Sequence, residues 1–185
     1  IQVSKGTSSV KNGYEALTGQ INVEFKKPQT TKDIVAVNLF ASSTNRFEAN
    51  ADASVKLNDR WTTMLLAHYE NETKAHDSND NGFADITRVE QYNLWNRWVY
   101  MGDRYVFQAG IKGMKEERKS GQVSHGNNNM DINHPYKINI ATDRYEAFTK
   151  NAIILNKEKN TNIALMLSGT LHNQDVGYGN KFYNE

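Results

Sequence analysis

The stretch from Asp77 to Asp85 holds the residues of this sequence that are best suited to bind an ion. It reads DSNDNGFAD, with Gly82 at the sixth position. The candidate ligands stand at positions one, three, five, seven and nine of a calcium loop: Asp77, Asn79, Asn81, Phe83 through its backbone carbonyl, and Asp85. Calcium takes hard oxygen ligands at this spacing, with glycine at position six. The stretch therefore predicts either a structural Ca²⁺ site or a plain turn rich in Asn, Asp and Gly.

One ligand of the usual calcium loop is missing from this stretch. A bidentate glutamate is expected at position twelve, where the sequence has Arg88. Glu90 or a residue of another loop would have to supply that carboxylate. Bound calcium would order a loop and would have a structural or ligand-linked role, not a catalytic one.

A second group of metal-ligating side chains lies in the stretch SHGNNNMDINHP, which contains His125, Met130 and His134. Two histidines and a methionine can ligate a metal or a haem iron, but the surrounding residues are more typical of a polar loop. No serine, histidine and acid have the spacing of a catalytic triad, and Gly6 and Gly13 form no phosphate-binding signature. The chain has no cysteine, which excludes thiolate chemistry and disulfides. We expect no enzyme and no required cofactor.

The composition narrows the class of protein further. The 185 residues carry a net charge of only +1, which gives no argument for nucleic acid as a partner. No run approaches the roughly 20 apolar residues of a spanning helix. A membrane barrel stays open, because its strands alternate apolar and polar residues and give a weak signal.

Alternation of that kind is clearest in the stretch RFEANADASVKL at 46–57. Every second residue is apolar: Phe47, Ala49, Ala51, Ala53, Val55 and Leu57. The residues between them are polar or charged, so the stretch predicts a strand with two opposite faces. Six other segments have the same period, at about 33–42, 61–71, 91–100, 104–114, 138–156 and 161–172. Period two over seven segments predicts a mainly β fold of antiparallel, up-and-down strands.

The connections between these segments differ in length. Short turns are expected at 58–60, 101–103 and 157–160, and they alternate with long polar connections at 72–90, at 117–135 and after 172. The first connection on the long-loop side, at 43–46, is an exception because it is short. Short turns at one end and long loops at the other are typical of a transmembrane β-barrel. Four aromatic residues near the short turns are consistent with a membrane-interface girdle: Trp61, Trp98, Tyr100 and Tyr105. Aromatic residues are also good strand formers, and a soluble β-sandwich stays open at this point.

Residues 1–28 do not show the repeat of alternating segments and turns that the rest of the chain has. They predict a compact α/β piece, with two short strands around a helical or coiled segment. The sequence reads IQVSKGTSSVKNGYEALTGQINVEFKKP. It resembles the end of the plug domain of TonB-dependent outer-membrane receptors, particularly those of the Bacteroidetes type. The residues that carry the resemblance are Ile1, Val3, Lys5, Gly6, Ser9, Gly13, Ala16, Gly19, Ile21, Asn22 and Val23. Gln20 departs from the family, which more often has a small or apolar residue there.

The resemblance implies two parts, the end of a plug domain at 1–28 and the N-terminal part of an outer-membrane barrel at 29–185. The strands would be about seven of the family's 22, and the chain a fragment of a longer receptor. Such receptors import a scarce ligand, such as a siderophore, haem, cobalamin, a metal or a small glycan, across the outer membrane of a Gram-negative bacterium. The expected partners are outer-membrane lipid, that ligand, and the TonB complex, which contacts the plug N-terminus. The alternative is a soluble or surface-exposed β-sandwich binding module, stabilised by calcium in one version.

Overall fold

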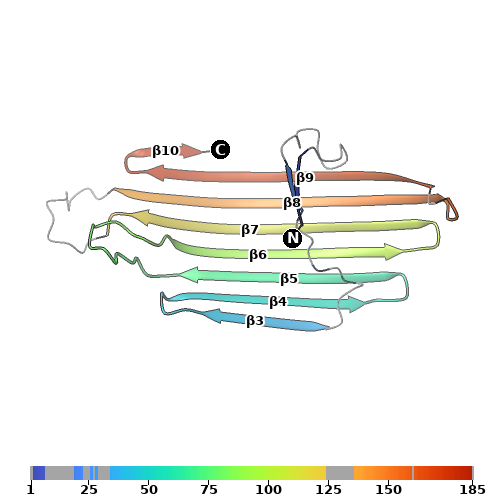
Figure 1. Ribbon diagram of the computed structural model, residues 1–185, viewed down its shortest axis with the longest axis horizontal. Helices are drawn as coiled ribbons and strands as arrows, with labels where there is room; N and C mark the ends of the chain where they lie inside the picture. Colours follow the sequence, from blue (N-terminus) through green and yellow to red (C-terminus); the bar gives the residue numbers. More distant parts are fainter. Residues whose placement is uncertain are drawn as a thin grey trace.

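The fold is one large antiparallel β-sheet with a small two-stranded sheet beside it (Figure 1). The computed structural model describes residues 2–6, 19–22, 26, 28, 34–123, 136–159 and 161–184. Within these ranges the chain is mainly β and contains no helix. The large sheet has eight strands in the order β10-β9-β8-β7-β6-β5-β4-β3, so each strand pairs with its neighbour in sequence. The predicted antiparallel, up-and-down arrangement is confirmed.

The strands lengthen along the chain from β3 to β8. Their bounds are β1 Gln2–Lys5, β2 Gly19–Asn22, β3 Val35–Ala41, β4 Arg46–Lys56, β5 Trp61–Glu72, β6 Arg88–Met101, β7 Tyr105–Gly121, β8 Lys137–Asn156, β9 Thr161–Tyr178 and β10 Lys181–Asn184. No helix in the described part of the chain is long and apolar enough to cross a membrane.

The pairing register lines up the alternating residues of neighbouring strands on two opposite faces. Ala51 pairs with Ala67, and Ala67 with Leu94, so the apolar residues of β4, β5 and β6 share one face, called here the apolar face. Its larger side chains are strongly exposed, with Leu94 at 53% and Ile111 at 64%. The residues between them form the polar face. A one-residue slip of any strand would exchange the two sets.

The polar face also holds the two buried apolar residues of the described core. Met64 is fully buried and Val99 is 3% exposed, and both alternate with residues of the apolar face on β5 and β6. Pro28 is buried as well. Its carbonyl accepts a hydrogen bond from the Ser54 hydroxyl at 3.1 Å. Pro28 therefore lies against the polar face.

The small sheet contains the described part of the plug-like motif. Lys5 pairs with Gly19, and Val3 pairs with Ile21. Gly6 ends β1 with φ +86°, a conformation that favours glycine. A Cβ on Gly19 would lie 2.9 Å from the Ser4 carbonyl oxygen, so the strand pair has room only for glycine there. Gly13, Ala16 and the expected helical piece between the strands lie outside the described residues; Asn22 ends β2.

Two predicted strand ends and one predicted loop are wrong. The strand expected to end at Met114 continues to Gly121, through the charged run KEERKS. The strand expected to end at His172 continues to Tyr178. The long loop expected after it is a tight turn at Gly179 and Asn180, which leads into β10. In each case the backbone ladder with the neighbouring strand continues where the apolar alternation of the sequence stops.

Candidate functional site

The loop between β5 and β6 contains the candidate calcium ligands. The Asp77 carboxylate accepts the backbone N–H groups of Asn81 at 3.1 Å and Gly82 at 2.7 Å. The Asp85 carboxylate accepts the Ser78 N–H at 2.7 Å. Asp80 and Gly82 have positive φ angles of 54° and 80°, which curl the loop around Asp77. Both predicted carboxylates therefore shape the loop by holding its backbone.

The remaining candidate ligands lie in the same loop. Asn79 and Asn81 accept backbone N–H groups through their side-chain oxygens, at 3.1 and 2.9 Å. Phe83 forms an isolated bridge with Gln122 at the end of β7. No group of three or more His, Cys, Asp or Glu side chains that could hold a metal ion occurs among the described residues. Calcium also accepts amide and carbonyl oxygens, and calcium binding by this loop stays a prediction.

In the described part of the chain, neither Arg88 nor Glu90 completes the calcium ligand set at its twelfth position. Arg88 is the first residue of β6. The Glu90 carboxylate accepts a hydrogen bond from the Tyr92 hydroxyl at 2.8 Å. His125, Met130 and His134 lie outside the described residues.

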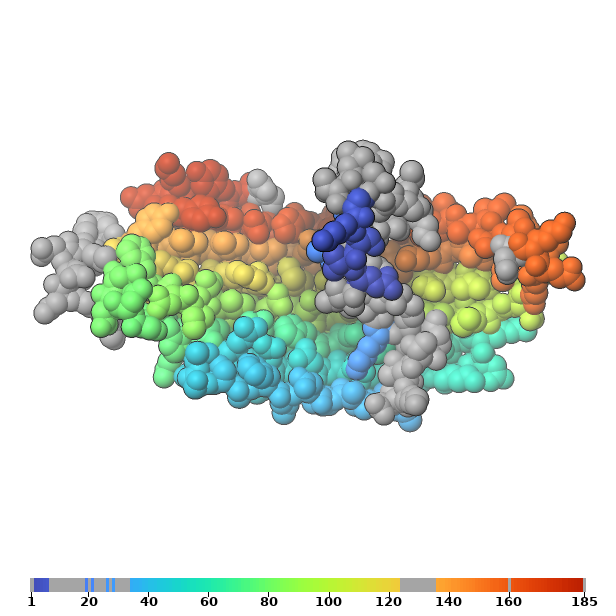
Figure 2. All heavy atoms as spheres, in the orientation of Figure 1, coloured from blue at the N-terminus to red at the C-terminus, as the bar shows by residue number. Residues whose placement is uncertain are grey.

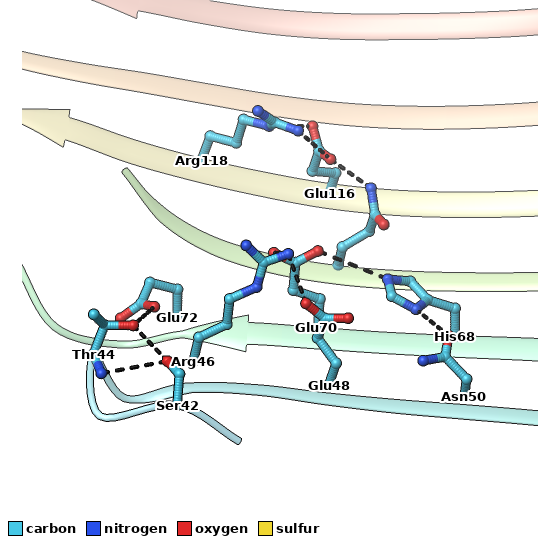
Figure 3. A network of polar contacts seen from close by, with 11 residues as sticks. Ser42, Thr44, Arg46, Glu48, Asn50, His68, Glu70, Glu72, Glu116 and Arg118 are labelled. Atoms are coloured by element: carbon cyan, nitrogen blue, oxygen red, sulfur yellow. Dashed lines mark hydrogen bonds and ion pairs between the residues drawn. The ribbon is translucent and has the colours of Figure 1, made fainter. Parts of the chain in front are cut away.

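A group of charged and amide side chains gathers on the polar face where β4 and β5 approach the long loops (Figure 3). Arg46 contacts two carboxylates, Glu48 at 2.6 Å and Glu70 at 3.1 Å. The His68 Nδ1 lies 2.7 Å from the Asn50 side-chain oxygen, and its Nε2 lies 3.7 Å from Glu70. One arginine thus offsets the charge of two adjacent carboxylates, which would otherwise repel each other.

The same group extends across β6 and β7. Arg118 binds Glu116 through two nitrogens, at 2.7 and 3.0 Å, and the Gln91 amide donates to Glu116 at 2.5 Å. The hydrogen bond from Arg118 holds the pKa of the Glu116 carboxyl below its usual value. We call this set the loop-end cluster: Arg46, Glu48, Asn50, His68, Glu70, Gln91, Glu116 and Arg118.

The loop-end cluster is suited to recognise a polar molecule by hydrogen bonds and charge. The register places Glu48, Glu70, Gln91 and Glu116 in one row across four strands. The alternation at 46–57 places Glu48 on a polar face but does not predict the row, because alternation fixes the face of a residue and not its neighbour on the next strand. No local pattern indicates the row, because the run at 115–120 is polar on both faces and lacks the alternation of a half-buried strand.

Glu72 is a buried carboxylate beside this cluster, with the residue only 4% exposed. One of its oxygens accepts the Thr44 hydroxyl at 3.4 Å, and the other has no hydrogen-bond partner among the described residues. The His76 Nε2 lies 3.8 Å from Glu72 and donates to the Thr44 backbone carbonyl at 2.6 Å. Glu72 and His76 thus connect the base of the candidate calcium loop to the short turn between β3 and β4.

The apolar face carries two rows of aromatic rings. In the loop-side row, Tyr69 lies 6.3 Å from Phe47 and 5.0 Å from Tyr92, measured between ring centroids. In the turn-side row, Trp61 contacts Trp98, Tyr100 and Phe107 at 5.1–6.4 Å, and Tyr100 contacts Tyr105 at 6.0 Å. The aromatic residues near the short turns therefore lie together, as the sequence predicted, and the structure adds a second row near the loops.

Comparisons of the chain with protein-family models, curated proteins and solved structures give no match. A function must therefore be argued from the residues and their geometry.

Proposed function

We propose that this chain is part of a TonB-dependent outer-membrane receptor, with β3–β10 in the barrel wall and residues 1–28 at the end of the plug. The observation that carries the proposal is the exposed apolar face between two rows of aromatic rings. Large apolar patches on the surface of a soluble monomer are rare. An apolar band with aromatic girdles at both edges is the surface that a barrel presents to lipid.

The height of the band supports this assignment. The step from Trp61 to Tyr69 is eight residues, or about 26 Å of strand at ~3.3 Å per residue. The step from Tyr92 to Tyr100 on β6 is the same. With strands tilted by about 35–45°, the band is about 20 Å tall, close to the ~25 Å apolar band of known barrels.

The polar side chains within the band have partners for their polar atoms. The Asn96 amide donates to the Thr63 hydroxyl at 3.3 Å and to the Met64 carbonyl at 3.2 Å. Its oxygen accepts a hydrogen bond from the Trp98 indole, and the Thr63 hydroxyl donates to the Arg97 carbonyl at 3.0 Å. Unpaired polar groups are costly in hydrocarbon, and this pairing removes that cost at the middle of the band.

The polar face suits the wet, plug-filled interior of such a barrel. It carries charges such as Asp52, Lys112 and Arg144, which would be costly against a dry second layer. The chain at Lys26 and Pro28 already lies against this face. The edges of the sheet at β3 and β10 have unpaired backbone groups, which in a bilayer need further strands to close the barrel.

The proposed activity is import of a scarce ligand, driven by the TonB complex and without chemistry on the ligand. The loop-end cluster lies where ligand from outside the cell would first reach the polar face. Its carboxylates, arginines and amides favour a polar cargo. Siderophore, haem, cobalamin, metal ion and small glycan remain the candidate cargoes. The long connection at 124–135, which would help to distinguish between them, lies outside the described residues.

Site-directed spin labelling of the intact protein in its membrane tests the proposal. Ala51 and Asp52 are adjacent on β4 and lie on opposite faces, so we expect a label at Ala51 to be accessible to oxygen in lipid and a label at Asp52 to an aqueous reagent. The alternative, a soluble β-sandwich module, predicts release into aqueous buffer and no lipid contact at Ala51. Release into aqueous buffer, or a label at Ala51 without lipid contact, would refute the assignment as a receptor.

Calcium binding by the loop is a separate proposal, supported by the oxygen ligands that Asp77 and Asp85 bring into one turn. We expect terbium luminescence, excited through nearby aromatic rings, to rise on titration of the intact protein and to be displaced by Ca²⁺. An Asp77→Ala variant removes one ligand and should lose the signal, whereas Asp59→Ala, in an exposed turn at the other end of the strands, should retain it. Equal signals from the two variants would count against the site.

A further inference from the structure

Lys26 and Pro28, which precede the large sheet in the sequence, are held by side chains of β4 and β6. Arg97 on β6 donates to the Lys26 backbone carbonyl at 2.7 Å. On β4, Asp52 binds the Lys26 ammonium at 2.5 Å, and the Ser54 hydroxyl donates to the Pro28 carbonyl at 3.1 Å. In Figure 2, the residues of β1 lie in front of the sheet.

These contacts differ in the strength they can supply. Lys26 is 54% exposed, and its ion pair with Asp52 contributes little by itself. The Arg97 and Ser54 hydrogen bonds go to backbone carbonyls, which side-chain substitution at 26 or 28 would not remove. Arg97 is further fixed by the Trp95 ring, 4.9 Å below its guanidinium, an arrangement that is itself stabilising.

We propose that Arg97, Asp52 and Ser54 form a clamp that carries mechanical load between the plug and the barrel wall; the proposal rests on the receptor function above. The first strand of the large sheet, β3, is the shortest of β3–β9, and its ladder with β4 covers only seven residues. A pull on the chain before Lys26 would open its ladder one pair at a time from Val35. The clamp transfers that pull to the longer strands β4 and β6, of 11 and 14 residues, and β3 stays in place while the plug moves.

Single-molecule pulling on the intact receptor measures the length of chain that is released before a contact resists the force. The chain has no cysteine, so Ser4→Cys and Glu158→Cys provide unique handles. If the clamp holds, the first extension is limited to the chain between residues 4 and 26, at most about 80 Å at ~3.6 Å per residue. If it does not hold, β3 leaves as well, and the first extension reaches about 140 Å, to residue 42.

We expect the parent protein to stop near 80 Å and an Arg97→Met, Ser54→Ala double variant to run to about 140 Å. Arg144→Met is the matched control, because Arg144 is a polar-face arginine whose ion pair is with Glu146 on its own strand; it should behave like the parent. A parent protein that runs directly to 140 Å, or a double variant that still stops near 80 Å, would overturn the clamp.

Hydrogen exchange separates a failed clamp from a failed receptor assignment. The Ser54 backbone N–H donates to the Ile34 carbonyl at 2.8 Å, next to the clamp. In detergent, without any membrane or pulling, Arg97→Met should speed exchange at Ser54 by roughly 10- to 100-fold, the loss of one hydrogen bond from a charged donor. Unchanged exchange at Ser54 would refute the clamp, whereas absence of lipid contact at Ala51 would refute the receptor alone.

Discussion

A series of arginine substitutions along β5 tests whether the apolar face lies in lipid. Leu65 is four residues from Trp61 and four from Tyr69, so it is midway between the aromatic rows, about 13 Å along the strand from each. With the tilt of a barrel strand, that is about 10 Å in depth from each girdle. In the proposed receptor, Leu65→Arg therefore places a charge at the middle of the bilayer, and Tyr69→Arg places one at its edge.

The expected costs follow from depth. Arginine on the lipid face costs about 2–4 kcal/mol at the midplane and about 0–1 kcal/mol near the interface. Leu65→Arg should thus lower the folding equilibrium constant by roughly 30- to 700-fold, Ala67→Arg by less, and Tyr69→Arg by about fivefold or less. His68→Arg, the next residue after Ala67 but on the polar face, is the control: it should lose only the contact with Asn50, about 1 kcal/mol, without the cost of a charge in lipid.

The assay is equilibrium unfolding of the intact protein from phospholipid vesicles in guanidinium chloride, followed by tryptophan fluorescence. Trp61, Trp95 and Trp98 report on both faces of the sheet. Equal costs at Leu65, Ala67 and Tyr69 would refute a bilayer around the apolar face, because a dry protein interface has no such gradient. A Leu65→Arg variant as stable as His68→Arg would refute burial of that face altogether.

Three further substitutions test the packing and electrostatics of the sheet. Met64→Ala removes the fully buried side chain of the polar face and should cost about 2–5 kcal/mol in the same assay; a cost below 1 kcal/mol would contradict that burial. Gly121→Ala puts a Cβ 2.4 Å from the Tyr136 carbonyl oxygen at a φ of +106°, so β7 should lose its end pairing with β8, seen as faster hydrogen exchange at Gln122; unchanged exchange would contradict the strain. The hydrogen bond with Arg118 lowers the pKa of Glu116 in the folded protein. The stability that this contact gives the fold is therefore fully present above the unfolded-state pKa, near 4.5, and is lost as the pH falls further. The parent should lose more stability than Glu116→Gln between about pH 5 and 3, and parallel pH profiles would contradict the Arg118 contact.

The sequence predicts those parts of the fold in which one face is apolar. From Phe47 to Val55, the alternation predicts both the strand and the residues that share each of its faces, because only an extended strand keeps the apolar residues together on one side. At 115–120 both faces are polar, and the charged run reads as a loop rim although it pairs on both sides as β7. Hydrogen-bond ladders stabilise such strand ends without any signal in side-chain polarity.

The candidate site was predictable to the same degree. The Asp77–Asp85 loop is a local motif, and its carboxylates lie in one turn because their spacing is short. The loop-end cluster depends on the register between strands and joins residues up to 72 positions apart, from Arg46 to Arg118. Local sequence patterns carry no information on that register, and the buried Glu72 is likewise visible only after the loops are placed.

The unequal lengths of the strands give the sheet a sloping rim. The pairing register carries Phe47 through Asn71, Glu90 and Glu117 to Ala141 of β8. Beyond this line β4 has one residue and β8 has four, a difference of three residues, or about 10 Å of strand. A molecule that approaches from the loop side thus meets a high flank formed by β7, β8 and β9 and a low flank at β3 and β4. The low flank leads directly to Arg46, Glu48 and Glu70. In the proposed receptor, a ligand would therefore reach the polar face sideways over the first hairpin, and the tall flank would limit the passage of a large one.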